Sequence, residues 1–244
     1  MPTDIISELR KETGKLDIEL TSAQEDRLLL YAKILAQENE KSNLTAIPVQ
    51  KFVTEHFIDS FTVLKTDKIR RNMKIADVGA GAGFPGVPIK ILETGISLYL
   101  IEPNNKKASF LRKLVEKLGI EGVEIIRARA EAAGREPDLR EKMDVVVARA
   151  VAGLPVLLEY ALPLCKVGGW FLAMKGPGVE KELEPARLAA AELGSRIDSV
   201  LKPYGRNHEK QRMIVQVQKD FPTSERYPRR TGIPVKRPLG GHFS

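Results

Sequence analysis

The stretch Lys74-Ile-Ala-Asp-Val-Gly-Ala-Gly-Ala-Gly-Phe-Pro-Gly86 determines the fold class of this chain. Residues 74–78 form a short, mostly apolar run, as expected of a buried strand. Three alternating glycines follow, Gly79, Gly81 and Gly83. Glycine allows tight turns and close approach of a ligand, and a Gly-rich turn before a helix directs backbone N–H groups at a bound group. The stretch therefore predicts a strand, a ligand-binding turn and a helix.

Two classes of ligand fit this turn. Asp77 before the glycines makes the pattern D-x-G-x-G-x-G, which is typical of class I methyltransferases that bind S-adenosylmethionine. The same residues contain G-x-G-x-x-G at Gly81, Gly83 and Gly86, the dinucleotide fingerprint. The motif alone leaves both ligands open, together with a turn that binds nothing.

The remaining chain indicates an α/β fold with a mostly parallel sheet. We expect strands at 74–78, 97–101, 123–127, 144–148 and 170–175, alternating with helices at 87–92, 106–118, 154–164 and 179–193. No helix lies between the apolar segments 196–202 and 211–219, so they should pair antiparallel. Together these segments predict a Rossmann-like, seven-stranded sheet with a terminal antiparallel hairpin, which is the class I methyltransferase layout. A dehydrogenase would instead continue with parallel strands.

We divide the chain into three parts. Residues 1–70 are predicted to be an N-terminal helical extension, 71–220 an S-adenosylmethionine-binding methyltransferase domain, and 221–244 a basic, extended C-terminal tail. Within the extension, Ser22-Ala-Gln-Glu25 predicts a capping box, and apolar spacing predicts a further helix over 50–64. Cys165 is expected to be a buried residue of a helical run.

The net charge of +7 is concentrated near the C-terminus. Residues 202–237 carry ten basic and three acidic side chains, whereas residues 1–201 are balanced. Such asymmetry indicates a polyanionic partner. No apolar run is long enough to span a membrane and no secretory leader is evident, so we expect a soluble, cytoplasmic protein. We expect neither a metal nor an obligate protein partner.

Polar residues follow the predicted parallel strands, whose carboxyl ends form the ligand-binding edge of such a sheet. Glu102 follows the second strand at the spacing typical of a ribose-binding acid. Ala130 and Glu131 follow the third strand and can address an adenine edge. Arg149 and Lys175 end the fourth and fifth strands. Together with Gly79 and Gly81, these residues predict a cofactor pocket.

Six motifs together carry a closer resemblance: Asn43-Leu-Thr45, Glu55-His-Phe-Ile-Asp-Ser60, Asp77-Val-Gly-Ala-Gly-Ala-Gly-Phe-Pro-Gly86, Ala148-Arg-Ala150, Met174-Lys-Gly176 and Tyr227-Pro-Arg-Arg-Thr-Gly-Ile-Pro-Val-Lys-Arg-Pro-Leu239. The Phe-Pro-Gly after the glycines and the Tyr-Pro-Arg-Arg-x-Gly of the tail are the specific ones. With these motifs the chain resembles the RsmG (GidB) family, the bacterial 16S ribosomal RNA guanine-N7 methyltransferases. The resemblance implies S-adenosylmethionine as cofactor, with contacts from Gly79, Phe84, Ala130, Glu131 and Arg149. It implies 16S ribosomal RNA, or the small ribosomal subunit, as partner and the guanine at position 527 of the family's substrate as target.

Guanine N7 carries a lone pair and no proton, so its methylation requires no general base. Placement and electrostatics should supply the catalysis, with Arg149 and Lys175 as candidate donors to guanine O6 or a phosphate. His56 is more typical of a structural histidine than of a base. In the tail we expect phosphate contacts, separate in space from the cofactor pocket, from Arg226, Arg229, Arg230, Lys236 and Arg237.

Three other functions remain open on the sequence. The same fold could methylate another RNA, a small molecule or a protein; the basic C-terminal charge argues against the last two substrates. A nicotinamide-dependent protein is disfavoured by Asp77 and the terminal hairpin. A catalytically silent RNA-binding factor is disfavoured by the intact glycine turn.

Overall fold

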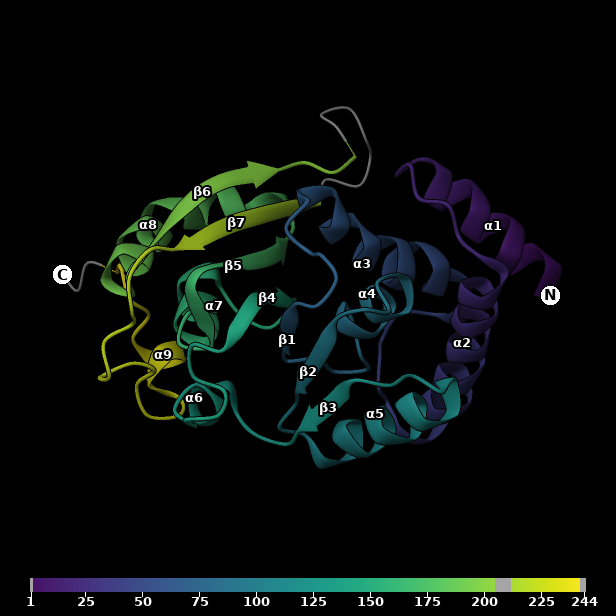
Figure 1. The fold of residues 1–244 in the computed structure, drawn as a ribbon, viewed down its shortest axis with the longest axis horizontal. Coiled ribbons are helices and arrows are strands. Elements are labelled where there is room, and N and C mark those ends of the chain that lie inside the picture. Colours follow the sequence, from purple (N-terminus) through teal and green to yellow (C-terminus); the bar gives the residue numbers. More distant parts are fainter. Residues whose placement is uncertain (1, 205–211, 242–244) are drawn as a thin grey trace.

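The computed structural model describes residues 2–204 and 212–241. Its sheet has the order β3-β2-β1-β4-β5-β7-β6, and β7 is antiparallel to both of its neighbours while the other pairs are parallel. Figure 1 shows these strands following one another across the molecule. The strands are β1 (Lys74–Val78), β2 (Ser97–Ile101), β3 (Val123–Ile126), β4 (Met143–Arg149), β5 (Cys165–Lys175), β6 (Ser195–Leu201) and β7 (Met213–Lys219). The predicted fold class is confirmed.

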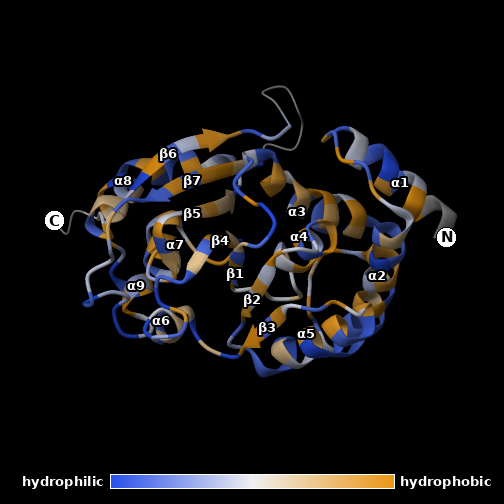
Figure 2. Cartoon of the chain, viewed as in Figure 1, coloured by the Kyte–Doolittle hydropathy of each residue, from blue (hydrophilic) through white to orange (hydrophobic). Residues whose placement is uncertain are grey.

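Helices cover both faces of the sheet, because successive strand residues point to opposite sides. Val145 and Val147 of β4 belong to one buried cluster, and Val146 and Ala148 belong to the other. The first cluster includes α4 (Gly86–Leu92) and α5 (Asn105–Leu118); the second includes α6 (Ala130–Ala133), α7 (Leu154–Ala161) and α8 (Leu183–Glu192). Figure 2 shows the apolar strands between helices with hydrophilic outer faces.

The N-terminal segments pack on the same face as α4 and α5. They begin with α1 (Pro2–Gly14) and α2 (Ser22–Ser42). The capping box predicted at Ser22 is wrong by one residue: Thr21 is the N-cap, and its hydroxyl and the Gln24 side chain bond each other's backbone N–H. The shift arises because Glu25 is buried in a bidentate ion pair with Arg10, at 2.6 and 2.8 Å, and so is unavailable to the cap.

The single helix predicted over 50–64 is also wrong. The chain passes through the 3-10 helix η1 (Val49–Lys51), the π-helix η2 (Phe52–Ile58), the short α3 (Asp59–Phe61) and the 3-10 helix η3 (Thr62–Thr66). His56, Phe57, Ile58 and Asp59 are four successive buried residues, so a single apolar stripe cannot describe the segment. π-helices are rare in proteins, and those that do occur frequently lie at functional sites.

Two boundaries near the C-terminal half of the sheet differ from the sequence prediction. Cys165 begins β5 instead of lying in a helix; burial raises the pKa of its thiol to about 12. The helix predicted from residue 179 starts as the 3-10 helix η4 (Pro177–Glu182) and becomes α8 only at Leu183. The hairpin forms as predicted between β6 and β7, although Gln211 and the turn 205–209 lie outside the described residues.

The C-terminal segment 221–241, which we call the strap, packs onto the domain. The sequence predicts an extended loop, and the structure adds one short helix, α9 (Ile233–Lys236). Figure 1 shows α9 beside α6 and α7. Tyr227 and Leu239 are buried in the core cluster of α7 and α8, and the Arg140 guanidinium donates to the carbonyls of Thr223 at 2.7 Å and Tyr227 at 2.8 Å. The strap is therefore held by side chains as well as by apolar packing.

Among the described helices, none combines the length and the apolar character that crossing a membrane requires.

We predict that Gly83→Ala destabilises the fold by about 3 kcal/mol or more, the sum of overpacking and left-handed strain. Gly83 has φ +99°, and a Cβ there would lie 2.7 Å from the Tyr31 hydroxyl and 2.9 Å from Val87 Cγ2. Gly119→Ala is the matched control, because Gly119 also has a positive φ of +59° but no atom within 4 Å of its would-be Cβ. It should cost about 1 kcal/mol. Urea unfolding of both variants checks this, and equal losses would contradict it.

Candidate functional site

The glycine turn lies where β1 meets α4, and all three alternating glycines have positive φ. They differ in what a side chain at each position would meet. A Cβ on Gly79 (φ +74°) would lie 2.6 Å from Val151 Cγ2, so packing excludes a side chain. A Cβ on Gly81 (φ +59°) would meet only the Gly79 carbonyl oxygen, at 3.8 Å, and would otherwise project into open space. Gly81 is thus the position at which the backbone itself faces a cavity.

Asp77 fixes the two ends of this turn. Its Oδ2 accepts a 2.7 Å hydrogen bond from the Gly86 N–H, which joins the end of β1 to the first residue of α4. Its Oδ1 is fully buried and, within the described part of the chain, has no partner. Burial raises the pKa of this carboxyl to about 7. Asp77 is 0% exposed and lines neither of the cavities described below, so this unpaired oxygen lies behind the turn.

A cavity of about 240 Å³ opens against the turn. Its lining includes five of the seven residues predicted to contact a cofactor, Gly79, Gly81, Glu102, Ala130 and Glu131, and also Val151 and Tyr160; the other two, Phe84 and Arg149, do not line it. We call it the cofactor cavity.

Glu102 supports the turn as well as lining the cofactor cavity. Its Oε2 accepts from the Gly81 N–H and its Oε1 from the Asn104 N–H, each at 2.8 Å. A carboxylate has about four acceptor sites, so these two bonds leave capacity for ligand hydroxyls.

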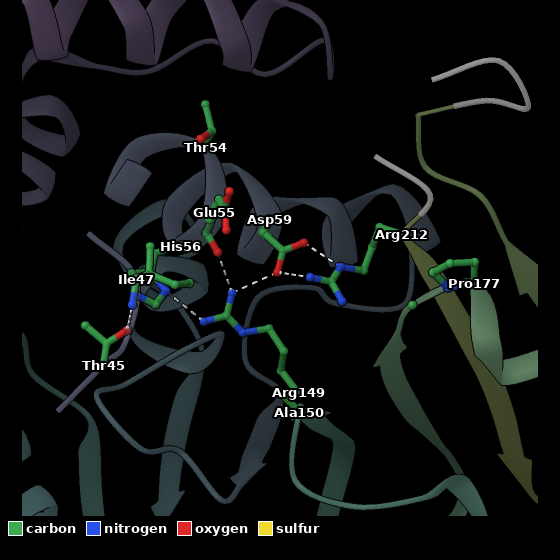
Figure 3. Close-up of a pocket in the computed structure, with 11 residues that line it drawn as sticks. Thr45, Ile47, Thr54, Glu55, His56, Asp59, Arg149, Ala150, Pro177 and Arg212 are labelled. Carbon is green, nitrogen blue, oxygen red and sulfur yellow. Dashed lines mark hydrogen bonds and ion pairs between the residues drawn. The ribbon is translucent and has the colours of Figure 1, made fainter. Parts of the chain in front are cut away.

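A second cavity, of about 510 Å³, lies at the carboxyl end of β4. It is lined by residues of η2, by Asp59 at the start of α3, by the segments that follow α2 and β5, and by Arg212 just before β7. Figure 3 shows Arg149 at its centre. Nη1 of Arg149 donates to the Glu55 carbonyl at 3.0 Å and to Asp59 Oδ2 at 2.8 Å. Arg212 forms a fork with the same carboxylate, at 2.5 and 2.7 Å. We call this the arginine cavity; Ala150 lines both cavities.

His56 is neutral in this arrangement. Arg149 Nη2 is 3.0 Å from His56 Nδ1, and since a guanidinium only donates, Nδ1 is the acceptor. The proton therefore sits on Nε2, which donates to the Thr45 hydroxyl at 3.0 Å. Burial, and then the Arg149 charge, lower the pKa of His56 to about 3. A group whose two nitrogens are both engaged and which resists protonation is not a general base.

Phe84 and Lys175 line neither cavity. The Phe84 ring lies between His56, at a centroid distance of 4.0 Å, and Tyr31, at 5.0 Å, with both pairs nearly parallel. Lys175 Nζ donates to Glu182 at 2.9 Å and to the Ala152 carbonyl at 3.1 Å. Both residues thus adjoin the site but contact other side chains and loops.

The predicted RNA-binding cations of the strap divide into two groups. Arg229 and Arg226 form ion pairs, with Glu159 at 2.5 Å and Glu192 at 3.1 Å respectively. Arg230, Lys236 and Arg237 are exposed.

Arg212 and Tyr160 are site residues that the sequence analysis does not name, whereas Asp59 belongs to a motif that it quotes. Asp59 lies three residues after His56 within the motif Glu55–Ser60, so helical spacing was an available signal. Arg212 had no such signal, because its partner Asp59 is 153 residues away in the chain.

Comparison with known proteins points to one family. The family model described as GidB, rRNA small subunit methyltransferase G, matches residues 24–212. The Ribosomal RNA small subunit methyltransferase G of Pelotomaculum thermopropionicum is 43% identical over 237 residues, which cover 96% of this chain and 99% of that protein. The protein of the same name from Acetivibrio thermocellus is 41% identical over 223 residues, 91% of each chain.

Solved structures resemble the fold at low sequence identity. MtNAS in complex with MTA and tNA has a TM-score of 0.53 and 15% identity, covering 80% of this chain and 74% of that one. A putative transferase from Pyrococcus horikoshii has a TM-score of 0.50 and 14% identity, covering 83% and 66%. These likenesses concern the fold alone.

The site makes a prediction about stability against pH. His56 has a pKa lowered from 6.5 to about 3, so below pH 6.5 the unfolded chain binds more protons and stability falls as the pH falls. Asp77 has a pKa raised from 3.8 to about 7, so the folded chain binds more protons and stability falls as the pH rises through that window. The two effects oppose each other between about pH 4 and 6.5, each at up to about 1.4 kcal/mol per pH unit.

Asp77→Asn removes only the second effect. Its unfolding free energy relative to the unchanged protein should therefore increase from about pH 4 to pH 7, at up to about 1.4 kcal/mol per unit. Urea unfolding across this range measures the difference, in which other titrating groups cancel. A difference independent of pH would refute the buried, unpaired carboxyl.

Proposed function

The chain belongs to the GidB family, rRNA small subunit methyltransferase G, as the sequence predicted, and we propose that it methylates N7 of a guanine in 16S ribosomal RNA. The observation that carries this proposal is the pair of neighbouring cavities: one faces the glycine turn, the other holds two arginines, and Ala150 lines both. A donor of the methyl group and an acceptor base can thus meet at one residue.

The cofactor is S-adenosylmethionine, which when bound supplies an electrophilic methyl group on a sulfonium sulfur. The open space at Gly81, which lines the cofactor cavity, fits such a ligand. We assign the ribose hydroxyls to Glu102 and the adenine to Ala130 and Glu131, which line the cavity beside it.

We assign the arginine cavity to the guanine. Its charged lining consists of Arg149 and Arg212 against Glu55 and Asp59, and with His56 neutral the four charges cancel. A neutral lining suits an uncharged base better than a phosphate. Protonation of His56 would add a positive charge where methylation makes the base cationic, so its low pKa favours the reaction.

Arg149 is the residue we assign to the guanine edge. Within the described residues, three of its five N–H groups are bonded, to Glu55, Asp59 and His56. The two others are available for guanine O6, which leaves the lone pair of N7 free for the methyl group. Lys175, the other catalytic candidate, holds the Ala152 carbonyl and Glu182, so we assign it to positioning the loop after β4.

One experiment tests the proposed function directly. N7-methylguanine is mapped in 16S ribosomal RNA from a strain lacking the gene, and again after the gene is restored. Loss and return of a single modification are expected; an unchanged map, with modification of another RNA, would favour the alternative substrate class. Titration calorimetry with S-adenosylmethionine and NAD separates the methyltransferase from a nicotinamide-dependent protein.

We predict that Gly81→Val abolishes detectable S-adenosylmethionine binding, because its side chain would fill the cofactor cavity. Gly119→Val is the matched control: it has the same φ of +59° and open space around its would-be Cβ, and it lies at the end of α5. Calorimetry on both folded variants decides. Near-normal affinity in Gly81→Val would refute the assignment of the cavity.

Arg149→Lys should lower the single-turnover methylation rate about 100-fold, because an ammonium cannot reproduce the planar set of donors. The S-adenosylmethionine dissociation constant should stay within about threefold, since Arg149 lines only the arginine cavity. Rapid-quench kinetics and calorimetry measure the two effects. If affinity falls and the rate at saturation does not, the direct cofactor contact implied by the family resemblance is favoured instead.

For the strap we predict phosphate contacts from its exposed cations. Replacing Arg230, Lys236 and Arg237 by Gln should weaken RNA binding and reduce the slope of log K against log salt by about 0.7–0.9 for each phosphate that is no longer neutralised. Filter binding at several salt concentrations measures this. Unchanged affinity and slope would place the RNA surface elsewhere, and Arg70, Arg71, Lys106 and Lys107 would be tested next.

A further inference from the structure

The strap touches the cofactor cavity through one hydrogen bond. The backbone N–H of Gly232 donates to Glu131 Oε1 at 3.0 Å. Glu131 is 4% exposed and lines the cofactor cavity. The spatial separation of tail and cofactor pocket that the sequence predicts is therefore wrong.

A buried ion pair anchors this part of the strap. The Glu159 carboxylate, on α7, is 0% exposed and accepts from the Arg229 backbone N–H at 2.7 Å and from its guanidinium at 2.5 to 3.1 Å. Arg229 Nη2 also donates to the Arg237 carbonyl at 2.8 Å, which spans α9. Gly232 lies between these two anchored points, so its N–H is held in place from both sides.

Gly232 needs a conformation that other residues rarely adopt. Its φ is +83° and its ψ is −13°, and it forms the N-cap of α9. A Cβ built on it would meet nothing within 4 Å. Lack of space therefore does not explain why glycine stands here. The positive φ explains it, because this backbone conformation sets the direction of the Gly232 N–H and glycine adopts it without strain.

On its other side, Glu131 faces Tyr160, which also lines the cavity. Burial, followed by the charge of the Glu131 carboxylate, raises the pKa of Tyr160 to about 12, so the phenol keeps its proton. The Glu131 carboxylate thus lies between the strap and Tyr160. Loss of its hydrogen bond to Gly232 would change the orientation of the carboxylate in the cavity.

We infer that the strap is a structural part of the cofactor site, with Gly232 as a positioning residue that orients Glu131 toward the adenine end of the cavity and Arg229 as its anchor. This inference rests on the proposed function, which places S-adenosylmethionine in that cavity. Because linkage is reciprocal, cofactor binding also stabilises the bond between Gly232 and Glu131.

The first test uses Gly232→Ala in the full chain. Alanine is strained at this φ without a steric clash, so the variant redirects the N–H and leaves the surrounding packing intact. The dissociation constant for S-adenosylmethionine should rise about tenfold. Gly168→Ala is the matched control, because Gly168 has φ +81°, no atom within 4 Å and a place at the exposed start of β5. It should lose similar thermal stability with unchanged affinity.

The second test is a double-mutant cycle with Glu131→Ala. In that background Gly232→Ala should have no further effect on affinity, since Glu131 is the group through which it acts. A tenfold loss of S-adenosylmethionine affinity in both backgrounds would overturn the inference, because Gly232→Ala would then act by loosening the structure and not through Glu131. Should Gly232→Ala not fold, Glu159→Gln/Arg229→Gln replaces the anchor without leaving a buried charge, and the same cycle applies.

Hydrogen exchange gives a readout independent of the variants. Exchange in the strap segment around Gly232 should slow on adding S-adenosylmethionine, and this protection should be absent in Glu131→Ala. Binding with no change in exchange and no effect of Gly232→Ala overturns the inference but leaves the proposed function standing. Absence of S-adenosylmethionine binding by the unchanged protein overturns both.

Discussion

The site depends on one buried guanidinium. The Arg149 side chain is 11% exposed at the end of β4, and a cation so removed from water must be paired and hydrogen-bonded. Among the described residues, its hydrogen-bond partners all come from the segment before the sheet: the Glu55 carbonyl, His56 and Asp59. This requirement explains why polar residues are buried in η2 and α3, and why the chain there leaves regular helical geometry.

The aromatic stack adds a second connection between the same parts of the molecule. Phe84, directly after the glycine turn, lies between His56 of η2 and Tyr31 of α2, and the Tyr31 hydroxyl donates to the Ala82 carbonyl inside the turn. The turn that faces the cofactor cavity is thus held from behind by the N-terminal segments. Through Tyr31 and His56, the segment 1–70 that the sequence predicts as an extension thus contacts the glycine turn directly.

What the sequence revealed depended on whether the cause was local. The strands, the glycine turn and the acid at Glu102 follow from periodicity and spacing, and the structure has them there, although β5 begins at Cys165 and not at residue 170. The pairing of Asp59 with Arg212 and the contact of Gly232 with Glu131 join residues 153 and 101 positions apart, and no local pattern encodes them. The displaced capping box has the same origin, since Arg10, 15 residues before Glu25, forms an ion pair with it. Phe84 was recognised as important, but its contacts are with the N-terminal helices.

The distribution of charge gives the two cavities complementary roles in the proposed reaction. Methyl transfer moves a positive charge toward the base, so the lining there must tolerate it. Glu55 and Asp59 balance the two arginines, and the low pKa of His56 keeps a further charge away. On the opposite side, Asp77 is fully buried behind the glycine turn and lines neither cavity, and burial raises the pKa of its carboxyl to about 7, so the turn carries little fixed negative charge there.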